Sequence, residues 1–119
     1  MTDGQLFSKE SANEILPEVA ERLKVLQEAL PAIQQMQISA SGNGGGAHAD
    51  QWKESLGLFQ ANLDWFSEAG ILIKDIAQGL VDFPSDQDGE RIYLCWKAGE
   101  PSVAFWHTPD DGFAGRQPL

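Results

Sequence analysis

The sequence predicts an α+β fold, in which an N-terminal antiparallel helical hairpin packs on a C-terminal antiparallel β-meander of three or four strands. Apolar residues recur every three or four positions in the first half of the chain, which is the period of an amphipathic helix. After Gly70 they alternate at every second position, and short connectors with turn-forming residues separate the alternating runs. The 119 residues fit one domain, predicted over residues 1–119.

The first predicted helix begins near Ser8, a suitable N-cap, and carries one apolar stripe. Its polar side faces the other way, so we interpret the stripe as core. Pro17 lacks a backbone donor and is expected to kink the helix, whereas Pro31 is expected to end it or to kink it again. The stripe consists of Ile15 or Leu16, Val19, Leu23, Leu26, Leu30 and Ile33.

A glycine-rich segment, residues 39–47, lies inside the predicted hairpin of residues 7–69. It lacks the Lys-Ser/Thr ending of a phosphate-binding loop and follows a helix, so we interpret it as a hinge. The second helix ends at Gly70, a typical C-cap residue. Leu58, Ala61 and Trp65 lie off its apolar stripe, which favours contact with both the partner helix and the sheet, or with a second subunit. The stripe is Trp52, Leu56, Phe59, Leu63 and Phe66.

Residues 70–119 are predicted to form the meander and a tail, with strands at 71–76, 80–83, 91–96 and 103–107. We expect Leu94 to lie opposite Phe105, and Trp96 opposite Val103. Alternation then gives one face that receives the helices and a reverse face with a different composition. The helix-facing set is Val81, Phe83, Ile92, Leu94, Trp96, Val103 and Phe105. The reverse set is Asp82, Arg91, Tyr93, Cys95, Ala104 and Trp106.

The reverse face combines aromatic rings, a thiol, an acid and a guanidinium, unlike the simple polar exterior of a one-sided sheet. We expect a subunit, the C-terminal tail or a ligand to cover it. Arg116 would bring the tail back across this face, with Phe113 as its anchor. The candidate ligand-binding residues are Asp82, Arg91, Tyr93, Cys95, Trp106, His107 and Arg116.

Two polar contacts are expected near this face. Asp82 and Arg91 would form a cross-strand ion pair, which is structural if exposed and holds an anionic or amide ligand if covered. Asp110 or Asp111 would orient the ring of His107.

Residues of metal-ligand type occur near the C-terminus, namely Cys95, Glu100, His107, Asp110 and Asp111. They show neither Cys-x-x-Cys nor His-x-x-x-His spacing, and Cys95 and His107 fall on opposite faces in the expected register. We therefore predict no metal and no cofactor. The same geometry argues against Cys95 as a nucleophile with His107 as its base, unless the register differs, and favours a buried inert thiol.

The composition is acidic, with 8 Lys and Arg against 18 Asp and Glu and a formal net charge of −10. Such a chain repels phosphate backbones and anionic lipid, so we predict neither a nucleic-acid partner nor a membrane partner. One Cys excludes an internal disulfide and suits a reducing compartment. No basic-then-apolar leader opens the chain, so we predict a cytoplasmic protein.

Several segments carry a resemblance to a known family: FSKESANEILPEV at the start, then GLVDFP, GERIYLCW, GEPSVAFWH and GFAGRQPL. From about Phe7 to the C-terminus the chain resembles the bacterial domain-of-unknown-function family 2203. The resemblance implies a small prokaryotic cytoplasmic protein and brings no established activity with it.

Two functions follow as expectations. The first is a homo-oligomeric binding or interaction module, a homodimer in its simplest form, because the helices and the sheet carry surplus apolar surface. The alternative is a small-molecule site suited to an anionic ligand, or an enzyme, on the reverse face of the sheet.

Overall fold

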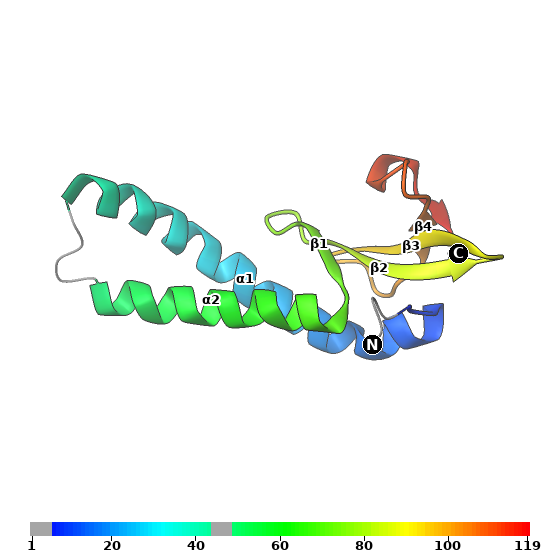
Figure 1. Cartoon of the computed structure of the whole chain (residues 1–119), viewed down its shortest axis with the longest axis horizontal. Coiled ribbons are helices and arrows are strands. Elements are labelled where there is room, and N and C mark those ends of the chain that lie inside the picture. The colour runs from blue at the N-terminus through cyan, green and yellow to red at the C-terminus, as the bar shows by residue number, and fades with distance from the viewer. Residues whose placement is uncertain (1–5, 44–48) are drawn as a thin grey trace.

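The computed structural model describes residues 6–43 and 49–119, with side chains for residues 6–35 and 53–119. Two antiparallel helices, α1 (Lys9–Asn43) and α2 (Ala49–Ala69), precede one five-stranded antiparallel sheet (Figure 1). A short 3₁₀ helix, η2 (Phe113–Gly115), lies between the last two strands. The strands follow chain order across the sheet: β1 (Leu72–Asp75), β2 (Leu80–Gln87), β3 (Glu90–Lys97), β4 (Phe105–His107) and β5 (Gln117–Pro118). The predicted α+β fold is confirmed, with an additional strand formed by the tail.

The N-terminus of α1 is capped as expected. The backbone N–H of Ser11 donates to Ser8 Oγ at 3.0 Å, and the N–H of Ser8 donates to Ser11 Oγ at 2.9 Å. Each serine thus satisfies a backbone donor of the other at the helix start.

α1 continues through Pro17 and Pro31 to Asn43, so of the two outcomes expected at Pro31, an end or a kink, the end is ruled out. Both prolines are exposed, whereas Leu16, Val19 and Ile33 next to them are buried. Packing on the buried side holds the helix together although each proline removes one backbone donor. Residues 39–43 of the predicted hinge therefore belong to α1, and residues 44–47 lie outside the described residues.

α2 ends where the sequence predicts. Gly70 has a φ of 78°, a left-handed conformation that glycine adopts without steric cost. The N–H of Ile71 then donates to the carbonyl oxygen of Phe66 at 3.0 Å, which satisfies one of the last carbonyl groups of the helix.

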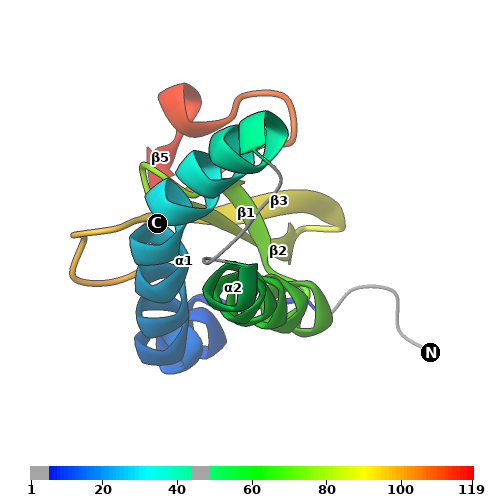
Figure 2. The same ribbon diagram turned by 90° about the vertical axis from the view of Figure 1, so that its left-hand side faces the viewer.

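The core lies between the helices and one face of the sheet (Figure 2). The end of the hairpin near residues 43 and 49 extends beyond the sheet, and the longest dimension of the molecule is 55 Å (Figure 1). We call the face in contact with the helices the inner face and the opposite one the outer face. The buried cluster comprises Phe7, Ala12, Leu16, Val19, Leu23, Leu26, Phe66, Ile71, Val81, Phe83, Ile92, Leu94, Trp96 and Val103.

The register between β3 and β4 differs from the expected one by one residue. Leu94 lies opposite Trp106 rather than Phe105, and Cys95 lies opposite Phe105. Residues directly opposite one another in an antiparallel pair share a face. Trp106 therefore belongs to the inner face, where it packs against the core, and Phe105 belongs to the outer face.

The register shift has a local cause in α1. The N–H of Val103 donates to Asn13 Oδ1 at 2.7 Å, and Asn13 Nδ2 donates to the carbonyl oxygen of Val103 at 3.2 Å. Because a helix side chain takes both backbone groups of Val103, this residue does not enter the ladder with β3. Its side chain still enters the core, and regular alternation begins only at Phe105.

We predict that Asn13→Ala lowers the free energy of unfolding by about 1–3 kcal/mol, because it leaves the backbone groups of the buried Val103 without partners. Urea denaturation followed by circular dichroism measures the change. Gln60→Ala is the matched control, since Gln60 is exposed and its side-chain amide donates to Asp64 Oδ1 at 3.0 Å, one turn further along α2. The control should change stability by less than about 0.5 kcal/mol, and equal effects of the two substitutions would contradict the prediction.

Candidate functional site

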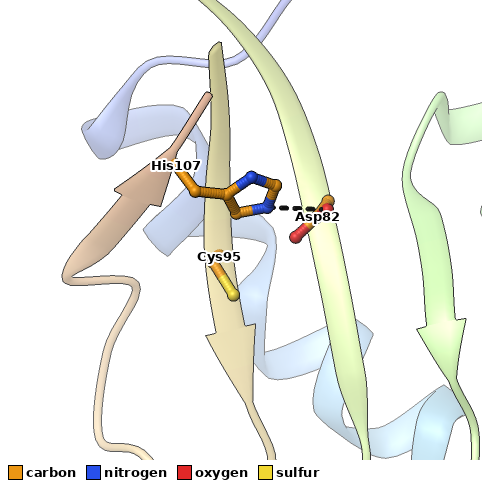
Figure 3. Close-up of side chains that lie close together, drawn as sticks. All are labelled: Asp82, Cys95 and His107. Carbon is orange, nitrogen blue, oxygen red and sulfur yellow. Dashed lines mark hydrogen bonds and ion pairs between the residues drawn. The ribbon is translucent and has the colours of Figure 1, made fainter. Parts of the chain in front are cut away.

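A cluster of three buried polar side chains lies at the centre of the outer face. Asp82 on β2 is directly opposite Cys95 on β3, and His107 on β4 is opposite Tyr93, two residues before Cys95. Figure 3 shows the three side chains approaching one another from neighbouring strands. Their exposed fractions are 2% for Asp82, 2% for Cys95 and 4% for His107.

The expected placement of Cys95 and His107 on opposite faces is therefore wrong. The one-residue shift of β4 brings His107 to the outer face together with Cys95 and Asp82. One ligand-type atom from each residue (a carboxylate oxygen, the sulfur and a ring nitrogen) lies within 4.8 Å of both others. The geometric objection to a metal site, and to a Cys95–His107 pair, no longer holds.

The ring of His107 is fixed by partners on both nitrogens. Nε2 lies 3.0 Å from Asp82 Oδ2, and Nδ1 lies 2.7 Å from the backbone carbonyl oxygen of Thr108. The ring also stacks on Tyr93, with centroids 5.6 Å apart and planes 27° apart. Asp82 and Thr108 thus orient the ring, and the expectation that Asp110 or Asp111 does so is wrong.

These contacts restrict where protons can lie. A carbonyl oxygen only accepts, so Nδ1 must carry the hydrogen of the bond to Thr108. In a neutral imidazole Nε2 is then an acceptor, and it faces another acceptor, the Asp82 carboxylate. A proton or another cation has to lie between these two atoms to make the buried contact favourable.

Cys95 is a thiol rather than a thiolate at neutral pH. Burial, together with the negative charge of Asp82, raises its pKa to about 11 even though Arg116 acts in the opposite direction. Reactive cysteines have lowered pKa values, because the thiolate is the nucleophile. The cluster as it stands therefore lacks an activated sulfur nucleophile.

A pocket of about 310 Å³ opens over the cluster. The C-terminal segment that contains η2 lies across the outer face, on the side of the sheet away from the helices (Figure 1). It contributes Pro109, Gly112 and Phe113 to the pocket, whereas the strands contribute Lys74, Leu80, Asp82, Tyr93, Cys95 and His107. A concave site with a few convergent polar groups is the usual form of a small-molecule site.

Arg116 fixes this segment over the sheet. Its guanidinium lies between two rings, 4.0 Å from the centroid of Phe105 and 4.3 Å from that of Phe113. Its Nη2 forms an ion pair with Glu100 Oε2, and its Nη1 donates to Glu100 Oε1 at 3.1 Å and to Cys95 Sγ at 3.8 Å. The tail does return across the outer face, as the sequence suggested, and its Arg116 packs on Phe113.

The Arg116–Glu100 pair changes the titration of both groups. Burial alone would raise the pKa of Glu100, but hydrogen bonds from Arg116 and from the N–H of Lys97 outweigh it, so the pKa lies below its ordinary value. The hydrogen bond to Glu100 raises the pKa of Arg116, against the effect of burial. Both groups are charged at neutral pH.

Two of the predicted candidates lie away from the pocket. Arg91 is exposed and sits opposite Asp86, whereas Asp82 sits opposite Cys95, so the expected Asp82–Arg91 pair is wrong. Trp106 is on the inner face for the reason given above. Asp82, Tyr93, Cys95 and His107 do line the pocket, and Arg116 contacts Cys95 and Phe113 at its edge.

Sequence reasoning missed Lys74, Leu80, Pro109 and Gly112 as lining residues. Lys74 lies where the pairing of β1 with β2 is irregular, between Ile73 and Asp75, so simple alternation along the strand does not predict its place. Pro109 and Gly112 belong to a loop without periodicity, and such a loop does not reveal from its sequence where it folds back.

The fold and the site together define a small α+β protein with a carboxylate–thiol–imidazole cluster at the floor of a pocket. The chain belongs to the family described as "Uncharacterized conserved protein (DUF2203)", which matches residues 5–119. No curated protein and no solved structure gives a significant match to it. Within the described residues, no helix combines the length and the apolar character needed to cross a membrane.

We predict that Glu100→Gln lowers the free energy of unfolding by about 1–2 kcal/mol at neutral pH, because it removes the charge from a largely buried pair. The pKa of Glu100 is lower in the folded protein than its ordinary value of 4.5, so the unfolded chain takes up this proton first. The stabilisation is therefore complete above about pH 4.5 and is lost as the pH falls through the lower folded value.

Urea denaturation at a series of pH values measures this effect. The difference between the wild-type chain and Glu100→Gln should narrow below about pH 4.5. Glu68→Gln, at an exposed position of α2, is the control for the change in net charge. A difference that stays constant down to the lowest pH at which the protein remains folded would contradict the assignment.

Proposed function

We propose that the protein binds a small anionic molecule in the pocket on the outer face of the sheet. The observation that carries this proposal is the position of three buried polar side chains, Asp82, Cys95 and His107, at the floor of that pocket. We further propose that it does so in the cytoplasm, because a free thiol at the site suits a reducing compartment.

The composition of the cluster favours a functional role over a purely structural one. Buried polar groups lower stability unless they are fully paired, and apolar side chains of similar size often serve stability better. The cluster adjoins a pocket, and the tail shields it from bulk water. A site that retains such groups at the floor of a cavity has the features expected for ligand recognition.

The pocket lining offers an anion one cationic side chain, that of Lys74, whereas the carboxylate of Asp82 is held by His107. Lys74 is exposed on β1 and contributes to the lining, where its ammonium group can reach a bound ligand. Arg116 is already paired with Glu100, and Arg91 lies elsewhere, so neither supplies this charge. Tyr93 adds a hydroxyl group and an aromatic surface. The volume of about 310 Å³ is at the lower end of the range for small-molecule sites, which suits a compact ligand.

We predict that inorganic phosphate and a panel of small mono- and dicarboxylates shift the amide resonances of Lys74, Tyr93, His107 and Phe113 in two-dimensional NMR spectra. Lys74→Gln should weaken the binding of the best probe about fivefold, the effect of losing roughly 1 kcal/mol from an exposed charge. Lys53→Gln is the matched control, because Lys53 is an exposed lysine of α2, on the other side of the sheet. Probes that leave all four resonances unmoved, or equal effects of the two lysine substitutions, would count against the proposal.

A homodimer is the second proposal, and it depends on α2. Leu58 is 56% exposed, the highest fraction among the exposed large apolar side chains of the described residues, and offers a contact to a second copy of the chain. Trp65, the other residue on which the expectation depended, is half-buried, with the guanidinium carbon of Arg22 4.7 Å from its ring centroid, so it adds less apolar surface than expected.

We predict that sedimentation velocity at micromolar concentration gives the mass of a dimer for the wild-type chain and that of a monomer for Leu58→Glu. A buried charge without a partner opposes association, which is the physical reason for the difference. Gln60→Glu, an exposed position two residues away on α2, is the control and should remain dimeric. A monomeric wild-type chain would exclude the dimer and would leave the pocket proposal untouched.

A further inference from the structure

We propose that Asp82, Cys95 and His107 bind a divalent transition-metal ion, which we assign as zinc, with its fourth coordination position open to the pocket. The inference rests on the proposed function, because the metal would lie at the floor of the same pocket and would bind the acidic group of the ligand.

The donor set is the first argument. A thiolate sulfur, an imidazole nitrogen and a carboxylate oxygen are the three protein donors that zinc uses. With metal–ligand bonds of about 2.0–2.3 Å, the ligand atoms around tetrahedral zinc lie roughly 3.3–3.8 Å apart. The three candidate atoms lie within 4.8 Å of one another, so small side-chain movements bring them to this spacing, and Nε2 of His107 and Oδ2 of Asp82, now 3.0 Å apart, have to separate slightly.

The orientation of His107 is the second argument. The carbonyl oxygen of Thr108 accepts the Nδ1 hydrogen, which leaves the Nε2 lone pair aimed at Asp82 Oδ2, 3.0 Å away. Metal-binding histidines are typically held by such a hydrogen bond from the nitrogen that does not bind the metal. Two acceptors that face each other in a buried site need a cation between them; a proton meets that need at the present 3.0 Å, and a zinc ion meets it once the two atoms are about 3.3 Å apart.

The local charge is the third argument. Zinc with a carboxylate, a thiolate and a neutral imidazole forms a group of net charge zero, which can be buried at little electrostatic cost. Binding displaces the Cys95 proton, as it does in other zinc–thiolate sites. The nearest guanidinium, that of Arg116, is compensated by Glu100 and adds little net charge to the site.

Three protein ligands and one open position are typical of zinc sites that bind an exchangeable ligand. The open side faces the pocket, where Lys74, Tyr93 and Phe113 lie. An anionic oxygen of the ligand would complete the coordination, and Lys74 would balance the remaining negative charge. The metal thus identifies the class of ligand more narrowly, as an anion with an oxygen or sulfur atom that can bind zinc.

The test begins with protein treated with a chelator and dialysed free of it. Titration with zinc alone, in competition with a chromophoric chelator, should give one ion per chain. Cobalt in place of zinc should give a sulfur-to-metal charge-transfer absorption in the near ultraviolet. Asp82→Asn, Cys95→Ser and His107→Gln should each weaken zinc binding by at least about 100-fold, since loss of even a supporting residue outside the ligand set costs about 10–100-fold.

Asp86→Asn is the matched control, because Asp86 is an exposed carboxylate on the same strand as Asp82 and should leave zinc binding unchanged. Substitutions of buried residues can prevent folding, so a second measurement uses the wild-type chain alone. Zinc should move the β-carbon resonance of Cys95 to the position of a metal-bound thiolate.

A folded wild-type chain that fails to bind zinc would overturn the inference, and so would zinc binding that leaves the Cys95 resonance in place. The outcome is separable from that of the proposed function. If phosphate or a carboxylate shifts the pocket resonances equally with and without chelator, anion binding in the pocket is supported and the zinc site is contradicted. If zinc binds through Cys95 and none of the anionic probes binds, the zinc site is supported and the proposal of anion binding is contradicted.

Discussion

The two hydrogen bonds between the Asn13 side chain and the backbone of Val103 are the constraint on which the outer face depends. They withdraw Val103 from the sheet and start β4 two residues later, at Phe105. Because side chains alternate with a period of two, this one-residue change in register exchanges the faces of Phe105, Trp106 and His107. A single helix side chain thus decides that a histidine, and not a tryptophan, faces the pocket.

The consequences differ on the two sides of the sheet. On the inner face the exchange changes the apolar packing little. Trp106 packs against the core where Phe105 was expected, so one aromatic side chain replaces another. On the outer face it brings an imidazole to a thiol and a carboxylate. The core tolerates either residue because burial of apolar area is not directional, whereas a polar site requires particular atoms at particular distances.

The tail completes the site by a different interaction. Arg116 forms an ion pair with Glu100, and its guanidinium lies between the rings of Phe105 and Phe113. The ion pair and the two cation–π contacts therefore hold the same side chain. Phe105 takes part in this contact because the register turns it outward. The segment that forms the wall of the pocket is therefore held by the same change in register that forms its floor.

The sequence by itself determined the fold class, the start of α1, the end of α2 and most of the core, because periodicity and capping are local properties of the chain. It also identified Asp82, Tyr93 and Cys95 as members of one face, since alternation within β2 and β3 is regular. Only the tertiary structure decided the places of His107, Trp106 and Arg91. Register between strands depends on contacts distant in sequence, here between residues 13 and 103, and no pattern within one strand records them.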